Sequence, residues 1–93
     1  MKIENIQLFY LSMPEILDEA DGSQDALIVK VEAGGLVGWG ECEASPLTSI
    51  ANFICPKSHS AANPIRDSIL GKNLNNLDDI KKIIYTVKHR SLM

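Results

Sequence analysis

The sequence has few cysteines, few aromatic residues and no long apolar run. Its two cysteines, Cys42 and Cys55, form no CxxC pair, and their spacing from His59 and His89 does not resemble a zinc site. The apolar runs are a few residues long, far below the roughly 20 residues that cross a bilayer. We therefore expect buried or idle thiols, no metal or cofactor site in this chain and no transmembrane helix.

Basic residues are also scarce. The chain has 9 Lys and Arg against 12 Asp and Glu, which gives a formal net charge of -3. Such a chain produces no positive field of the kind that attracts a phosphate backbone, so nucleic acid is not expected as a partner. Residues 1–20 lack the basic-then-apolar pattern of a signal peptide, which favours a soluble, cytoplasmic protein without a membrane partner.

The first half of the chain predicts three β-strands. Residues 2–13 are rich in Ile, Leu, Phe and Tyr and stop at Pro14, which cannot donate to a sheet ladder. Residues 26–33 alternate between two faces, and Gly34-Gly35 can take the positive φ of a tight hairpin turn. A strand over residues 36–43 should therefore return antiparallel to the preceding strand.

A two-residue turn fixes the register of this hairpin. Branched side chains then lie opposite small ones, and Gly38 and Gly40 lower the β-propensity, so we expect another element to approach their backbone closely. The expected pairs are Ala33 with Leu36, Val31 with Gly38, Val29 with Gly40 and Leu27 with Cys42 on one face, with Trp39 opposite Lys30 and Glu41 beside Ile28 on the other.

The second half predicts helices. Residues 45–54 begin with Ser-Pro, a cap followed by proline at the first helical position, and carry apolar residues on one face before Pro56 ends the run. Residues 63–71 repeat this start with Asn-Pro and close with a glycine, which predicts a helix of about two turns. Residues 77–90 combine an apolar stripe with acidic residues at the start and basic residues at the end, matching the helix dipole.

This order of elements favours a segregated α+β layout over a parallel α/β fold. The predicted fold is a three-stranded antiparallel β-meander followed by a helical segment of two to three helices. A chain of 93 residues with 45% hydrophobic content suits one domain, residues 1–93, with one core. Residues 91–93 bring no glycine, proline or polar tail after the last helix, so we expect a fragment of a longer protein.

Few side chains have a pattern that indicates catalysis. Glu41 and Glu43 point to the same side of a strand, but an isolated pair at a strand end is more typical of solvated carboxylates. Trp39 is more typical of a core or an interface than of ligand stacking, and the basic helix end explains His89. His59 lies in a polar loop without a partner acid nearby in sequence, so a surface histidine and a substrate contact both stay open.

One set of residues resembles a known family. Lys2-Ile3 opening a strand, residues 26–32, a glycine turn and Leu36-Val37-Gly38-Trp39-Gly40-Glu41 are similar to the N-terminal capping domain of the enolase superfamily, in its mandelate racemase and muconate lactonizing enzyme-like branch. Residues 69–74 and the helix from Leu77 resemble the continuation of that domain, so the resemblance covers nearly the whole chain. The Gly-Trp-Gly-Glu element is a structural signature and not a catalytic one.

The resemblance implies a two-part enzyme. In the family, such a cap precedes a β/α barrel that binds Mg²⁺ through three acidic residues and abstracts a proton next to a carboxylate. The reactive groups lie at the ends of the barrel strands, so we expect no catalytic residue in this chain and no activity of the chain alone. The implied partners are the missing C-terminal barrel domain and a small carboxylate substrate, and a homo-oligomer is compatible with the family.

The cap of the family contributes loops that close over the barrel mouth and select the substrate. By position these loops are residues 13–24 and 44–60, and the stretch 15–25 carries five acidic residues and few large apolar groups. Polar loops suit a polyhydroxy substrate, which favours a lyase that dehydrates an acid sugar, with an isomerase such as a racemase also compatible. The candidate substrate-binding residues are Asp18, Glu19, Ser45, Lys57, Ser58 and His59.

A second interpretation treats the chain as a small stand-alone binding or interaction module without catalysis. That interpretation predicts a well-folded protein without a large exposed apolar patch. A fragment of an enzyme would instead leave the surface meant for the barrel uncovered.

Overall fold

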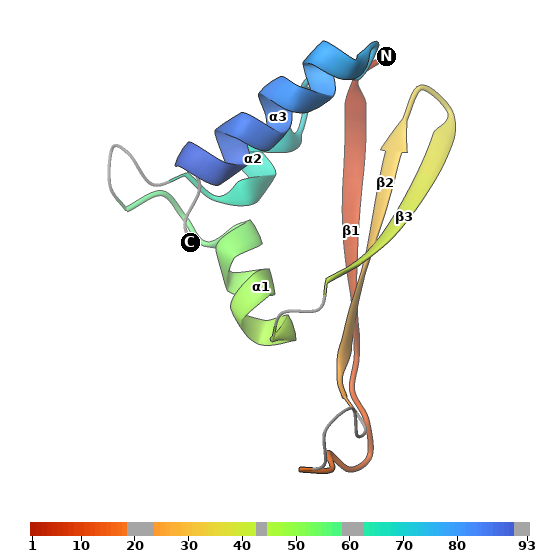
Figure 1. The fold of residues 1–93 in the computed structure, drawn as a ribbon, viewed down its shortest axis with the longest axis vertical. Helices are drawn as coiled ribbons and strands as arrows, with labels where there is room; N and C mark the ends of the chain where they lie inside the picture. Colours follow the sequence, from red (N-terminus) through yellow and green to blue (C-terminus); the bar gives the residue numbers. More distant parts are fainter. Residues whose placement is uncertain (19–23, 43–44, 59–62, 91–93) are drawn as a thin grey trace.

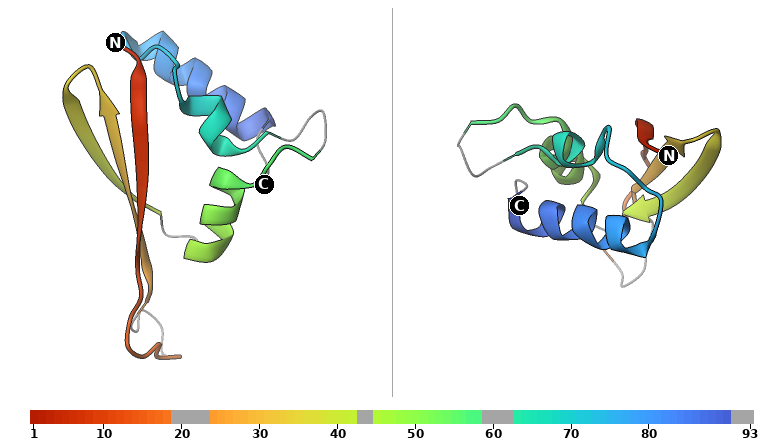
Figure 2. Two further views of the ribbon diagram at one scale, coloured as in Figure 1. Left: turned by 180° about the vertical axis from the view of Figure 1, so that it is seen from behind. Right: turned by 90° about the horizontal axis from the view of Figure 1, so that it is seen from above.

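The computed structural model describes residues 1–18, 24–42, 45–58 and 63–90, which form three helices and one antiparallel sheet of three strands in sequence order. The helices lie together on one side of the sheet (Figures 1 and 2). This architecture confirms the predicted α+β class. The elements are β1 (Ile3–Leu11), β2 (Ala26–Ala33), β3 (Leu36–Cys42), α1 (Pro46–Ile54), α2 (Ile65–Ile69) and α3 (Leu77–Arg90).

The β2–β3 hairpin turns on two glycines, as the sequence predicted. Gly34 and Gly35 have φ values of 57° and 78°, which residues with a side chain rarely adopt. The predicted register is confirmed at every pair. Leu27, Val29, Val31 and Ala33 lie opposite Cys42, Gly40, Gly38 and Leu36, and Lys30 and Ile28 lie opposite Trp39 and Glu41.

Strand β1 contains a bulge that the sequence pattern did not indicate. Ile3 pairs with Ala33 and Asn5 pairs with Glu32, so two steps along β1 match one step along β2. Because side chains alternate along a strand, residues 3 and 6 would otherwise point to opposite faces. The bulge brings both isoleucines to the face that the helices cover.

The connection between α2 and α3 pairs with the beginning of β1. The Ile3 N–H donates to the Lys72 carbonyl at 2.9 Å, and the Gly71 N–H donates to the Ile3 carbonyl at 2.9 Å. The Leu74 N–H donates to the Met1 carbonyl at 2.7 Å. These bonds fix the helical layer to the edge of the sheet.

Of the two N-caps that the sequence predicted, Ser45 is the N-cap of α1, although its side chain makes no capping bond. At α2 the N-cap is Pro64, so the prediction of Asn63 as the cap is wrong by one residue, and proline precedes the first helical turn. At α3 the Asp79 N–H donates to the Asn76 side-chain oxygen at 2.9 Å. The Asp79 carboxylate accepts a bond from the Asn75 N–H at 3.1 Å, so both ends of this exchange satisfy donors at the helix start.

The core is small for the length of the chain. The accessible surface is 6698 Å², compared with about 5,300 Å² for a compact monomer of this mass. The radius of gyration is 14.8 Å, compared with about 12 Å for a compact domain of this length. Apolar surface therefore stays uncovered. None of the described helices is long and apolar enough to cross a membrane. The buried residues are Ile3, Leu27, Ala33, Phe53, Pro64 and Ser68.

The sheet face over β3 is part of this uncovered surface. A Cβ added at Gly38 or Gly40 would meet no atom within 4 Å, so the prediction that another element approaches them is wrong for the described chain. The helices α1 and α2 face a cavity whose sheet side is formed by β1 and β2, and Cys42 is the β3 residue that lines it. An apolar groove of about 530 Å³, here called the β3 groove, is lined mainly by Met1, Val29, Val31, Leu36, Gly38 and Leu74.

The space between the sheet and the helices is also incompletely filled. A cavity of about 320 Å³ separates Leu8 and Leu27 of the sheet from Phe53, Ile65 and Ile69 of the helices. Protein interiors are normally packed with few voids larger than a water molecule. The helical layer is thus held to the sheet mainly by the β1 edge pairing and by a few buried side chains.

This packing predicts a sharp difference between two leucines on the same sheet face. Leu27 is 1% exposed, so Leu27→Ala should lower the free energy of unfolding by about 2–5 kcal/mol. Leu36 is 64% exposed, so Leu36→Ala should change it by less than about 0.5 kcal/mol. Urea unfolding followed by circular dichroism measures both, and equal losses would show that the core does not lie under β2.

Candidate functional site

The first predicted loop extends from a two-stranded arm at the end of the sheet. β1 and β2 pair as far as Leu11 and Ala26, beyond the last pair of β3, and residues 12–18 continue from this arm (Figure 1). Met13, Ile16 and Leu17 are 41%, 53% and 45% exposed. The described part of the loop therefore presents apolar side chains as well as the acidic groups that dominate its composition.

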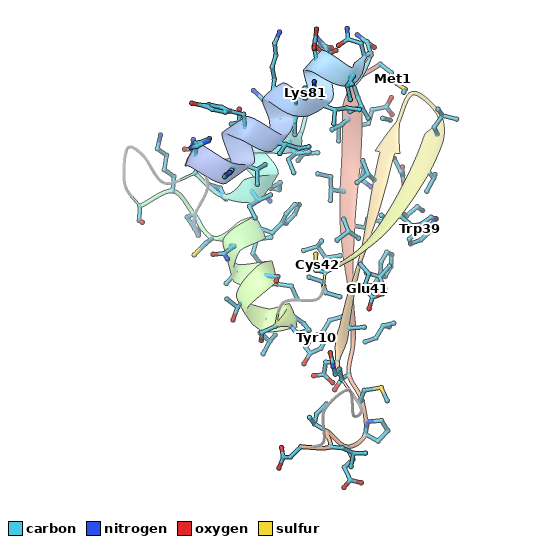
Figure 3. All side chains as sticks on the ribbon, viewed as in Figure 1. Met1, Tyr10, Trp39, Glu41, Cys42 and Lys81 are labelled. Atoms are coloured by element: carbon cyan, nitrogen blue, oxygen red, sulfur yellow. The ribbon has the colours of Figure 1, made fainter. Side chains whose placement is uncertain are left out.

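The base of this loop is held by one carboxylate. The Tyr10 hydroxyl donates to Asp25 Oδ2 at 2.5 Å, and the Met13 N–H donates to Asp25 Oδ1 at 2.7 Å. Tyr10 precedes the loop and Asp25 follows it, so the two bonds connect the two ends of the loop. Figure 3 shows Tyr10 at this lower part of the sheet. We call this group the Tyr10–Asp25 clasp.

The clasp shifts the acidity of both side chains. The hydrogen bond from Tyr10, and then the bond from the Met13 N–H, lower the pKa of Asp25 because they stabilise its charged form. The same bond to Asp25, followed by partial desolvation and the charge of Asp25, raises the pKa of Tyr10. Asp25 thus stays ionised and accepting over the physiological pH range.

The remaining predicted site residues do not gather around the clasp. Asp18 is exposed in the described loop, and Ser45 is the exposed N-cap of α1, where its side chain makes no capping bond. Lys57 and Ser58 are exposed and follow the other end of α1, whose nine residues span about 13 Å. The two predicted loops lie apart in Figure 1, with residues 13–18 at the tip of the arm and residues 55–58 beyond α1. Glu19 and His59 lie outside the described residues.

Other candidates from the sequence have ordinary surroundings. Glu41 is exposed on β3 and Glu43 lies outside the described residues, so their pairing stays a prediction. The ring of His89 lies 4.2 Å from that of Tyr85 at the end of α3. In the described part of the chain no three His, Cys, Asp or Glu side chains gather closely enough to hold a metal ion.

Trp39 lies on the sheet face away from the β2 residues that form the core. Its ring centroid is 6.0 Å from that of Phe9, and the Lys30 ammonium lies 5.6 Å from the centroid. The side chain is nevertheless 64% exposed, so it is not part of the core of this chain. The sequence also allowed a place for Trp39 in an interface, and this stays a prediction.

Sequence reasoning missed the clasp and the β3 groove. The clasp joins residues 15 positions apart, and only the β1–β2 register brings them together. The signal was present in part, because an aspartate directly before a strand commonly bonds to nearby backbone groups. The β3 groove exists because no described element covers Gly38 and Gly40. A local sequence pattern does not contain this information.

The chain is similar to a protein of known structure. A crystal structure described as a predicted mandelate racemase from Rhodobacter sphaeroides matches with a TM-score of 0.90 and 60% sequence identity. The match covers 97% of this chain and 23% of that chain, so the sequence spans about a quarter of the relative. No family model and no curated protein matches the chain.

The clasp predicts a measurable shift in the acidity of Asp25. Tyr10→Phe removes the larger of the two causes, so the pKa of Asp25 should rise toward the ordinary value of 3.8. Because the folded-state pKa is lowered, the stability from the clasp is present above the unfolded-state pKa and is lost as pH falls through the folded-state pKa. Carboxyl ¹³C NMR titration measures the midpoint, and an unchanged midpoint in the variant would contradict the clasp.

Proposed function

We propose that this chain is an N-terminal capping domain of the enolase superfamily, in its mandelate racemase-like branch, and that it selects the substrate of an enzyme that abstracts a proton next to a carboxylate. The observation that carries the proposal is the 60% identity over nearly the whole chain, combined with a fold match to only 23% of the relative.

The uncovered apolar surface supports a second polypeptide segment against this domain. The β3 groove and the cavity under the helices are lined mainly by aliphatic side chains, and both lie on the helical side of the sheet. Monomeric proteins rarely leave contiguous apolar patches of this kind exposed. In the proposed enzyme, a catalytic barrel covers these two apolar surfaces. A stand-alone module offers no such explanation for their exposure.

The chemistry in the proposed parent enzyme belongs to the barrel. Mg²⁺ would stabilise the enediolate that forms when the proton next to the carboxylate is removed. The described residues of this chain do not fit a Mg²⁺ site, so the cap contributes binding, orientation and exclusion of water. The clasp supports this role because it fixes the base of a loop that would otherwise pivot. The unpaired thiols of Cys42 and Cys55 suit a reducing compartment such as the cytoplasm.

Two substrate classes have support from different loop residues. Lys57 and Ser58, with His59 and Glu19 outside the described residues, offer polar groups to the hydroxyls and carboxylate of an acid sugar, whose dehydration makes the enzyme a lyase. The exposed Met13, Ile16 and Leu17 instead suit a hydroxy acid with an apolar substituent, for which racemisation makes the enzyme an isomerase. Dehydration releases water and leaves a 2-keto acid, whereas racemisation exchanges the α-proton without loss of water, so product analysis separates the two.

The cap role is tested in the complete enzyme. Replacing Lys57 and His59 together by Ala should raise KM or change the preferred substrate, because the loop that carries them is assigned to substrate selection. Lys81→Ala is the matched control, since Lys81 is exposed on α3 far from both loops (Figure 3). Unchanged kinetics of the double variant on the best substrate would remove this loop from the site.

The enzyme and module interpretations also differ in the coding sequence. The proposal predicts that the reading frame continues past Met93 into a barrel with a lysine or histidine base and three acidic metal ligands on successive strands. Sequencing the region decides this directly. A stop codon after Met93, with no barrel sequence downstream, would favour the stand-alone module.

A further inference from the structure

The arm formed by β1 and β2 is only two strands wide where the first predicted loop begins (Figure 1). Strand β3 ends opposite Leu27, so the last pair of the arm, Leu11 with Ala26, has no third strand beside it. A two-stranded ribbon is marginally stable in water by itself, and the entropic cost of closing a loop grows with its length. The ladder alone is therefore a weak support for the start of the loop.

The Tyr10–Asp25 clasp supports the same point through side chains. Asp25 Oδ2 accepts the bond from the Tyr10 hydroxyl at 2.5 Å, and Asp25 Oδ1 accepts the bond from the Met13 N–H at 2.7 Å. Tyr10 belongs to the ladder, whereas Met13 lies two residues past the end of β1. One carboxylate thus connects the beginning of the loop to a strand residue, and hydrogen bonds to a charged acceptor are stronger than neutral ones.

The clasp lies on the helical side of the sheet. Tyr10 pairs with Leu27, and directly opposed residues place their side chains on the same face. Leu27 lines the cavity under the helices, so its face is the one toward α1 and α2. The β3 groove and this cavity, which the proposed barrel covers, lie on that side too. The base of the loop is therefore fixed on the side where the proposed enzyme holds its substrate.

We propose that Tyr10 and Asp25 are positioning residues, which hold residues 12–18 in their substrate-binding arrangement before the substrate binds. This inference rests on the proposed function of the chain as a cap. When a protein binds its ligand only with a segment in one arrangement, the apparent affinity falls with the fraction of molecules that have this arrangement. The clasp raises that fraction. Because it contacts neither the substrate nor the reacting atoms, the bound complex reacts equally fast without it.

The positioning role is tested in the folded chain by hydrogen exchange. Tyr10→Phe keeps the ring and removes only the hydroxyl, and it should speed exchange of the Met13 amide at least about threefold. Asp25→Ala removes both acceptors and should speed it further. Tyr85→Phe is the matched control, since it removes the hydroxyl of a tyrosine on α3 that is 62% exposed, and it should change nothing.

The Ile3 amide separates positioning from overall stability, because it donates to Lys72 at the other end of the sheet. Its exchange should change less than that of Met13 in both clasp variants. Unchanged exchange of Met13, or equal acceleration of Met13 and Ile3, would overturn the proposal.

Kinetics of the complete enzyme test the consequence for the substrate. Tyr10→Phe and Asp25→Ala should each raise KM at least about threefold and leave kcat unchanged, whereas Tyr85→Phe should change neither. The double variant should have the KM of Asp25→Ala alone, because Tyr10 acts only through Asp25. Unchanged KM in both single variants, or a loss that falls on kcat, would overturn the proposal.

Failure of this inference is distinguishable from failure of the proposed function. Incorporation of solvent deuterium into the product reports removal of the proton next to the carboxylate, and it is measured with mandelate and with acid sugars such as gluconate. An unaltered enzyme that incorporates none overturns the proposed function and the inference together. An unaltered enzyme that incorporates deuterium, with clasp variants that keep its KM, overturns the inference alone.

Discussion

The two-sided pairing of Ile3 is the interaction on which the rest of the structure depends. On one side Ile3 pairs with Ala33 of β2, and on the other it exchanges backbone bonds with Gly71 and Lys72. Its side chain is 4% exposed, beneath the helices. Because the cavity between sheet and helices leaves few other buried contacts, this point joins the two layers. The terminal amine of Met1 bonds to the Asn75 side chain and ties the start of α3 to the same point.

The bulge beside Ile3 links this pairing to the hairpin. Glu4, the residue that the bulge adds, accepts a bond from the Gly34 N–H at 3.2 Å, so the same short segment supports the turn that sets the β2–β3 register. The other end of the sheet is closed separately by the Tyr10–Asp25 clasp. The Ile3 end of the sheet therefore anchors the helices, and the Tyr10–Asp25 end anchors the loop that follows β1. Between them lies an apolar face that this chain leaves open.

Local patterns predicted the parts of the fold that local chemistry determines. Two glycines in the turn fixed a register that was correct from Leu27 to Cys42, and the Ser-Pro start placed α1 correctly. The bulge and the clasp were missed because each depends on a partner far away in sequence. The prediction that another element approaches Gly38 and Gly40 was wrong. Their lack of side chains suggested a close neighbour, and the described chain places no atom there. The candidate site was predictable only as loops, and the described residues 13–18 and 55–58 of these loops lie apart in the structure (Figure 1).

We propose that another polypeptide segment covers the apolar face of this domain and thereby stabilises its fold. The direct measurement is hydrogen exchange of the Ile3 amide, which donates to Lys72, in the isolated chain and in the chain grafted in place of the matched 23% of the Rhodobacter sphaeroides protein. Covering the apolar face should slow exchange in the grafted protein by at least about tenfold, equivalent to about 1.4 kcal/mol. Equal exchange rates in a folded graft would contradict the claim.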